Sequence, residues 1–136
     1  MKKFILAIGV LMIGFTAQSQ EVKKDKNAKV SMKVDGICGM CKKRIETAAL
    51  KTVGVKFAIW SVETHQLNLI MDERKTNVSK VQENILKVGH DILLENDKKL
   101  VAKNEAYNSV HPCCKYRDEE IVLDHEGGLK KQKKKN

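Results

Sequence analysis

Arginine and aromatic residues are scarce in this sequence, although the chain is strongly basic. Of its 136 residues 26 are Lys or Arg, but the arginines are only Arg44, Arg74 and Arg117, and aromatic residues make up 4%. Proteins that recognise nucleic-acid sequences rely on arginine side chains and on aromatic rings that stack on bases. We therefore predict no nucleic-acid partner and interpret the formal net charge of +9 as a diffuse surface charge.

Hydrophobic runs long enough to cross a bilayer, which takes about 20 residues, are also absent. The longest run extends from Phe4 to Phe15, follows two lysines, and precedes a small-x-small pattern at Ala17 and Ser19. This combination is typical of a secretory signal peptide. We predict that residues 1–19 are such a peptide. The mature protein would then be periplasmic or secreted, without a transmembrane anchor, in a compartment where its cysteines could form disulfides.

Signatures of common enzymes are missing as well. No Ser/His/Asp arrangement, no glycine-rich loop that could hold a phosphate and no paired-carboxylate pattern stands out in the sequence. A chain of 136 residues allows one ordinary domain with an extension and excludes a large multidomain enzyme. We therefore predict that the protein is not an enzyme.

Hydrophobic periodicity is strong between residues 28 and 95. Alternating apolar residues predict strands, and apolar residues at helical spacing predict helices. The expected strands are 30–34, 55–59, 67–71 and 92–94, and the expected helices follow Cys41 and Asn77. In the second strand this alternation places Val55, Phe57 and Ile59 inward and Trp60 out of phase. The order predicts an α+β, ferredoxin-like βαββαβ fold, with two helices on one face of a four-stranded antiparallel sheet.

The remaining segments differ from this region in composition. We predict a polar linker at residues 20–27, a domain at 28–100, an extension at 101–120 and a charged, disordered tail at 121–136. The extension contains a short helix from Asn104 to Val110, followed by adjacent cysteines, Cys113 and Cys114.

The chemistry of the chain is concentrated where the first strand meets the first helix. Cys38 and Cys41 lie at the start of that helix, where unpaired backbone N–H groups and the helix dipole favour a thiolate. We therefore expect both cysteines to have a lowered pKa. Two thiolates three positions apart can converge on one ion, and their softness selects Cu(I), Zn(II) or similar metals over Mg²⁺ and Ca²⁺.

Residues 34–41, with the sequence VDGICGMC, and the following Ile45-Glu46 resemble the metal-binding motif of heavy-metal-associated domains. This family includes copper chaperones, metal-pump domains and periplasmic mercury-binding proteins. The resemblance implies the same ferredoxin-like fold, with Cys38 and Cys41 as metal ligands and Ile45 as a core residue behind the loop. Where the family usually has Met-Thr before the first cysteine, this chain has Gly36-Ile37, and we expect Ile37 to pack beneath the loop instead. The later Cys-Cys-x-Tyr also resembles small exported members from Bacteroidetes-type bacteria.

Three further residues are candidate ligands. His90 follows Gly89 in a loop that faces the metal site in the family, so it is either a third ligand or an exposed histidine without a role. For Cys113 and Cys114 three interpretations remain open. They form a vicinal disulfide, they pair with other cysteines, or they fold back and add thiolates to the Cys38–Cys41 site.

The favoured function is that of an exported metallochaperone or scavenger. We expect it to bind a soft ion, Cu(I) before Zn(II) or Hg(II), at an exposed CxxC site. It would then pass the ion by ligand exchange to a metal-transporting membrane protein or another acceptor domain. Two alternatives are a thiol–disulfide oxidoreductase and a secreted interaction module stapled by disulfides. The single proline, Pro112, and the Ile37 before the first cysteine differ from the thioredoxin pattern.

Overall fold

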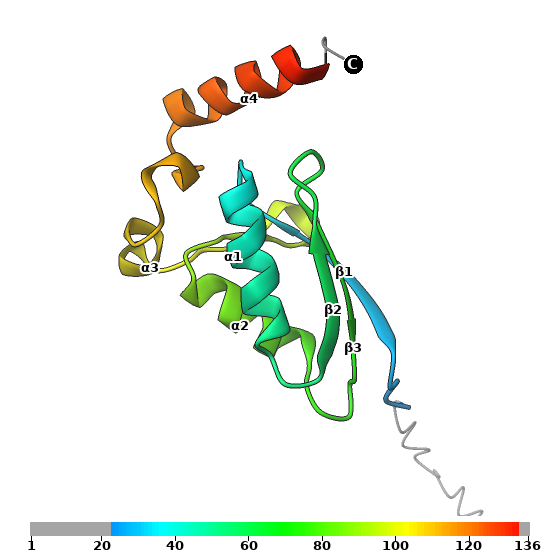
Figure 1. Ribbon diagram of the computed structural model, residues 1–136. Coiled ribbons are helices and arrows are strands. Elements are labelled where there is room, and N and C mark those ends of the chain that lie inside the picture. The colour runs from blue at the N-terminus through cyan, green and yellow to red at the C-terminus, as the bar shows by residue number, and fades with distance from the viewer. Residues whose placement is uncertain (1–22, 134–136) are drawn as a thin grey trace, which may run out of the picture.

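The computed structural model describes residues 23–133, so the predicted signal peptide lies outside the described residues. The expected order of elements is confirmed: β1 (Ala28–Val34), α1 (Gly39–Leu50), β2 (Val55–Trp60), β3 (Gln66–Met71), α2 (Val78–Lys87) and β4 (Ile92–Leu93). Helices α1 and α2 cover one face of the sheet (Figure 1). The α+β, ferredoxin-like architecture therefore agrees with the prediction.

The sheet has one strand more than the four predicted. Its order is β2-β3-β1-β4-β5, and each neighbouring pair is antiparallel. The additional strand β5 (Lys99–Leu100) pairs with β4 across a short 3₁₀ turn, η1 (Glu95–Asp97), in which Asn96 and Asp97 have positive φ. Two residues are too few to show an alternating pattern, so the sequence carries no periodic signal for this strand.

The inward face of β2 differs from the prediction. A bulge between Val55 and Phe57 shifts the alternation by one residue. Phe57 and Ile59, which were expected to point inward, are each 47% exposed, whereas Trp60 is completely buried. A single inserted residue reverses the face that all following side chains adopt, and periodicity alone cannot reveal it.

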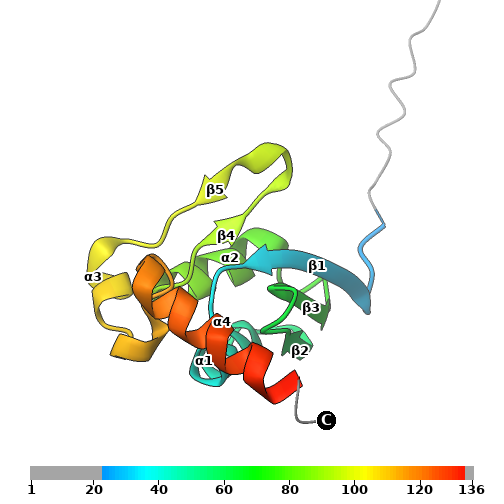
Figure 2. The same cartoon turned by 90° about the horizontal axis from the view of Figure 1, so that it is seen from above.

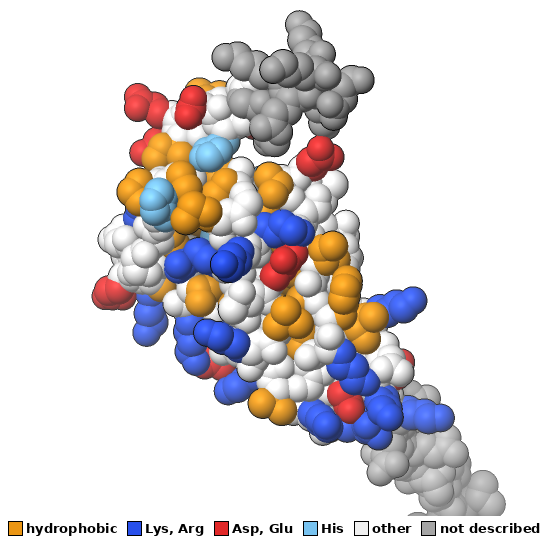
Figure 3. Space-filling view, in the orientation of Figure 1, with side chains coloured by type: hydrophobic (Ala, Val, Ile, Leu, Met, Phe, Trp, Pro, Cys, Tyr) orange, Lys and Arg blue, Asp and Glu red, His pale blue; other side chains and the backbone are white. Residues whose placement is uncertain are grey.

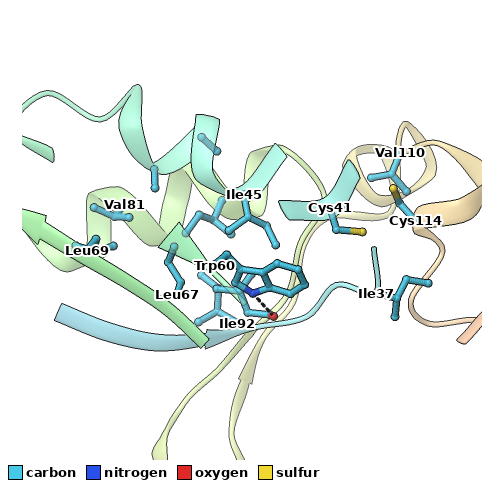
Figure 4. Close-up of a cluster of buried hydrophobic side chains, with 14 of the residues drawn as sticks. Ile37, Cys41, Ile45, Trp60, Leu67, Leu69, Val81, Ile92, Val110 and Cys114 are labelled. Atoms are coloured by element: carbon cyan, nitrogen blue, oxygen red, sulfur yellow. Dashed lines mark hydrogen bonds between the residues drawn. The ribbon is translucent and has the colours of Figure 1, made fainter. Parts of the chain in front are cut away.

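Trp60 forms the core beneath the loop between β1 and α1. Its indole N–H donates a hydrogen bond of 3.0 Å to the carbonyl of Val34, and its ring lies among buried side chains close to Cys41 (Figure 4). Gly36 allows this approach, because a Cβ there would lie 2.9 Å from the Cβ of Cys41 and 3.0 Å from the Trp60 ring. Ile37 and Ile45 are buried in the same core, as expected.

The extension is folded and returns to the domain. It contains α3 (Asn104–Asn108), close to the predicted short helix, and the 3₁₀ turn η2 (Pro112–Cys114). The prediction of a disordered tail is wrong for most of its length, since α4 spans Glu119–Lys133. Two acidic residues in the first turn of α4 stabilise the helix, because their negative charges lie at the positive end of the helix dipole. Ile121 and Val122 pack against the core.

Helix α4 lies across the N-terminal end of α1 (Figures 1 and 2). Within residues 23–133, no helix combines the length and the apolar content that a membrane span requires. The extension and α4 therefore gather at the end of the domain that carries the CxxC motif.

Candidate metal centre

Three cysteine sulfurs meet at the start of α1. The Sγ of Cys38 lies 3.5 Å from the Sγ of Cys41 and 3.5 Å from the Sγ of Cys114. All three atoms are within 4.8 Å of one another. An ion at the centre of three thiolates, at a metal–sulfur distance of roughly 2.3 Å, would hold the sulfurs about 4 Å apart. The observed spacing therefore needs only small displacements to hold one ion.

The local backbone explains the convergence of the first two cysteines. Cys38 is the extended residue directly before α1, and its carbonyl accepts the N–H of Lys42 at 3.0 Å. Cys41 lies in the first turn, so both side chains are on the same side of the helix start. This part of the site was expected from the sequence spacing.

Cys114 reaches the site because the extension is anchored to the domain at Asp91. The carboxylate of Asp91 accepts hydrogen bonds from the Arg117 guanidinium at 2.6 and 3.1 Å, and from the backbone N–H of Ala102 at 2.7 Å. The hydroxyl of Tyr116 donates to the carbonyl of Gly89 at 2.9 Å and accepts from the N–H of Asp91 at 3.0 Å. These contacts hold the segment that directly follows Cys114.

Gly89 makes the docking sterically feasible. It has φ of +87°, and a Cβ at this position would lie 2.5 Å from the carbonyl oxygen of Ala106 in α3. The position therefore requires glycine for its backbone conformation and for the close approach of α3. Gly89 follows the end of α2, and it also allows the extension to dock against the domain.

The centre is more enclosed than expected. Cys41 and Cys114 are completely buried, whereas Cys38 is partly exposed. Figure 4 shows the side chains of Cys41 and Cys114 projecting from α1 and η2 into the same space. The expectation of an exposed loop site is therefore met only in part by Cys38, which is partly exposed, and is wrong for Cys41, because η2 covers the end of α1.

The acidity of the thiols follows this difference in exposure. Burial alone would raise the pKa of Cys38, but the backbone N–H and thiol of Cys41 and the thiol of Cys114 stabilise the thiolate, so the pKa is lowered overall. Burial raises the pKa of Cys41, and burial beside the other two thiols raises that of Cys114. The predicted lowering is confirmed for Cys38 and wrong for Cys41, where loss of water outweighs the helix terminus.

His90 is fully buried, which contradicts the interpretation as an exposed loop residue. Its Nδ1 donates to the carbonyl of Asp35 at 2.8 Å, and its ring stacks on Tyr116 with centroids 5.6 Å apart. Burial lowers the pKa of His90. The histidine is not part of the group of ligand atoms that the described residues bring together. In the structure it contributes to the contact between the domain and the extension.

All four cysteines are free thiols, but the adjacent pair is divided between two environments. Cys114 joins the buried centre, which agrees with the interpretation that the extension folds back to add a thiolate. The Sγ of Cys113 lies 3.9 Å from that of Cys114 and contacts His111 and Met40 instead. Sequence reasoning did not assign a role to Asp91 or Arg117. The sequence feature that could have indicated this anchor is the Tyr116-Arg117 pair directly after Cys-Cys-Lys.

Comparison with known proteins identifies the family of the domain that carries the CxxC motif. Residues 31–91 match the family model of the heavy-metal-associated domain. No curated protein matches the chain.

Solved structures that resemble the chain include a CopZ metallochaperone, with 30% identity, 48% of this chain and 100% of that chain covered, and a TM-score of 0.47. Oxidized MerP from Ralstonia metallidurans CH34 has 24% identity, 57% and 99% coverage, and a TM-score of 0.46. A copper-carrying variant of CopA from Bacillus subtilis has 31% identity, 52% and 93% coverage, and a TM-score of 0.46. The matched family region contains the β1–α1 loop and both cysteines of the CxxC motif, and the chain belongs to the heavy-metal-associated domain family.

Proposed function

We propose that this protein is an exported carrier that binds one soft ion on Cys38, Cys41 and Cys114 and passes it on by ligand exchange. The favoured ion is Cu(I). The observation that carries the proposal is the meeting of three free thiols within 4.8 Å at the start of α1. The ion is cargo, so no resident cofactor and no enzymatic step are part of this function.

Three sulfur donors favour Cu(I) and Hg(II) over Zn(II). Structural Zn(II) sites are almost always four-coordinate, and the described residues bring three ligand atoms together here. Soft thiolates also discriminate against Mg²⁺ and Ca²⁺ in favour of thiophilic ions such as Cu(I). Membership of the heavy-metal-associated domain family supports a metal ion as the cargo.

Cys38 is the residue from which transfer starts. It is the most accessible thiol of the three and the one whose pKa is lowered. A thiolate of the acceptor can bond to the ion on this side while the ion is still held by Cys41 and Cys114. The bond to Cys38 then breaks, and no free ion is released. We propose a metal-transporting membrane protein or another heavy-metal-associated domain as the acceptor, because a second CxxC loop would supply the thiolates that this exchange needs.

The test is native mass spectrometry of the reduced protein loaded with Cu(I), Zn(II) or Hg(II). We expect the ion held by the three thiols to be lost when Cys38 and Cys41 are both replaced by Ser, and to bind more weakly in Cys114→Ser. Met71→Leu, a buried methionine at the far end of β3, is the matched control and should bind normally. Undiminished binding after the double cysteine substitution would refute the carrier function.

The three thiols also support a second candidate, a thiol–disulfide oxidoreductase. Its basis is the combination of a lowered pKa at Cys38 with two further thiols 3.5 Å away that could resolve a mixed disulfide. Catalytic acceleration of insulin reduction by dithiothreitol, lost in Cys38→Ser, would favour this activity over metal transfer.

A further inference from the structure

We propose that Met40, His111 and Cys113 form a second, outer position for a soft ion, which connects to the buried centre through the thiol of Cys114. An incoming ion would enter through this position, whereas transfer to the acceptor starts at Cys38. The inference rests on the proposed function and extends it from one ion site to two connected sites.

The geometry of the outer position depends on Cys113. Its Sγ lies 3.0 Å from the Nδ1 of His111 and 3.4 Å from the thioether sulfur of Met40. Thiolate, imidazole and thioether are all soft or intermediate donors that suit Cu(I). They come from two segments 73 residues apart in sequence, α1 and the η2 region, that only the docked extension brings together.

The imidazole of His111 presents its lone pair to this site. The backbone N–H of Cys113 donates to Nδ1 at 3.3 Å, so Nδ1 is unprotonated and the thiol proton of Cys113 can point toward the same atom. An ion that replaces this proton would also take the Nδ1 lone pair from the Cys113 N–H, and it would sit between Nδ1 and Sγ. With metal–ligand distances of roughly 2.0 and 2.3 Å and a tetrahedral angle, these atoms would be about 3.5 Å apart. The pair therefore has to open by about half an ångström.

A continuous series of sulfur atoms connects the two positions. The successive Sγ distances are 3.5 Å from Cys41 to Cys38, 3.5 Å from Cys38 to Cys114, and 3.9 Å from Cys114 to Cys113. Each is no longer than the sulfur–sulfur spacing of about 4 Å that one bridging ion spans. An ion can thus exchange one sulfur for the next without becoming free.

The outer donors are more exposed than the two buried cysteines of the inner centre. Met40 is 47% exposed and His111 is exposed, whereas Cys114 and Cys41 are completely buried. A cavity lined by Met40 and His111 together with basic side chains opens beside the outer donors. Figure 3 shows histidine and hydrophobic side chains together on this face, with lysine and arginine side chains below them. The outer donors are therefore reachable, whereas in the inner centre Cys38 alone is partly exposed.

Protons balance each transfer. Cys113 releases its thiol proton to water as the ion binds. When the bond to the ion passes to Cys114, Cys114 releases its thiol proton and Cys113 takes up a proton again. No electron is transferred, and the ion keeps its oxidation state.

The experiment is a Cu(I) titration of the reduced protein followed by native mass spectrometry. We expect two ions in the unmodified protein and one in the double variant Met40→Leu/His111→Ala. Met32→Leu, a half-buried methionine on β1, is the matched control and should retain both ions. The changed residues are exposed, so the variant should keep its fold, which circular dichroism will verify.

The outcomes separate this inference from the carrier function. Loss of the inner ion alone in Cys38→Ser/Cys41→Ser supports both proposals. A single ion in the unmodified protein, or two ions in Met40→Leu/His111→Ala, would overturn the outer position and leave the three-cysteine centre intact. A second ion that depends on Cys113 but not on Met40 and His111 would also overturn it, because Cys113 would then belong to the inner centre.

Discussion

The two cysteine pairs of this protein behave in opposite ways. Cys38 and Cys41 are three positions apart and their sulfurs are 3.5 Å from each other, whereas Cys113 and Cys114 are adjacent and face different surroundings. At the start of a helix, residues three apart share a face, and consecutive residues do not. The first pair is therefore a site set by local geometry. The second pair contributes to a site only through the docking of the extension.

The core under the first pair should be the most sensitive point of the molecule. Replacing Trp60 by Ala is expected to reduce the free energy of unfolding by about 3–5 kcal/mol, because a fully buried aromatic side chain is lost beneath the CxxC loop. Urea denaturation followed by circular dichroism measures this loss. Phe57→Ala, on the same strand but 47% exposed, is the matched control and should cost far less. Equal losses would contradict the shifted face of β2.

The docking of the extension, which positions the second cysteine pair, depends on Gly89. Gly89→Ala should lower the free energy of unfolding by about 3 kcal/mol, since it combines a positive φ with overlap against Ala106. It should also detach the extension, so that limited proteolysis cuts between residues 101 and 118. Gly39→Ala meets no atom within 4 Å and serves as the control. An extension that stays protected in Gly89→Ala would show that its docking does not need this close approach.

The ion pair between Asp91 and Arg117 links the extension to the domain through charge. Arg117→Ala is expected to cost about 1.5–3 kcal/mol, because the buried carboxylate loses its charged donors. Arg74→Ala removes another arginine–carboxylate pair, with Asp72, and should leave the extension protected from proteolysis.

This pair also predicts a pH dependence. Asp91 is buried, which by itself raises its pKa, but the Arg117 guanidinium and the N–H of Ala102 lower it overall. A carboxyl whose pKa is lower in the folded than in the unfolded state stabilises the fold fully above the unfolded value of about 3.9. This stabilisation is lost as the pH falls below that value. We expect stability to decline below about pH 4, and less steeply in Arg117→Ala; equal slopes would contradict the assignment.

The smallest effect concerns reactivity within the centre. Cys38 should react with iodoacetamide before Cys41 and Cys114 in the metal-free protein, because it is accessible and its pKa is lowered while burial raises theirs. Peptide mapping after brief alkylation at neutral pH measures the order. Faster modification of Cys41 would show that η2 does not cover the end of α1 in solution.

The sequence was sufficient to predict the element order from β1 to β4, the position of the CxxC motif at the start of α1, and the inward orientation of Ile45. These features depend on neighbours within a few residues, and hydrophobic periodicity records them directly. The inward orientation of Trp60 was missed because one bulge residue reverses a strand face. The raised pKa of Cys41 was missed because burial comes from a segment more than 70 residues away.

By itself, the sequence determined that two thiols converge, because a helix start with Cys-x-x-Cys permits little else. Only the tertiary structure decided that Cys114 joins them, that Cys113 turns to His111 and Met40, and that His90 is buried away from the cluster. The physical reason is that the ion pair at Asp91, the Tyr116 hydroxyl and the missing side chain of Gly89 act together across elements distant in the chain. No local pattern encodes that combination.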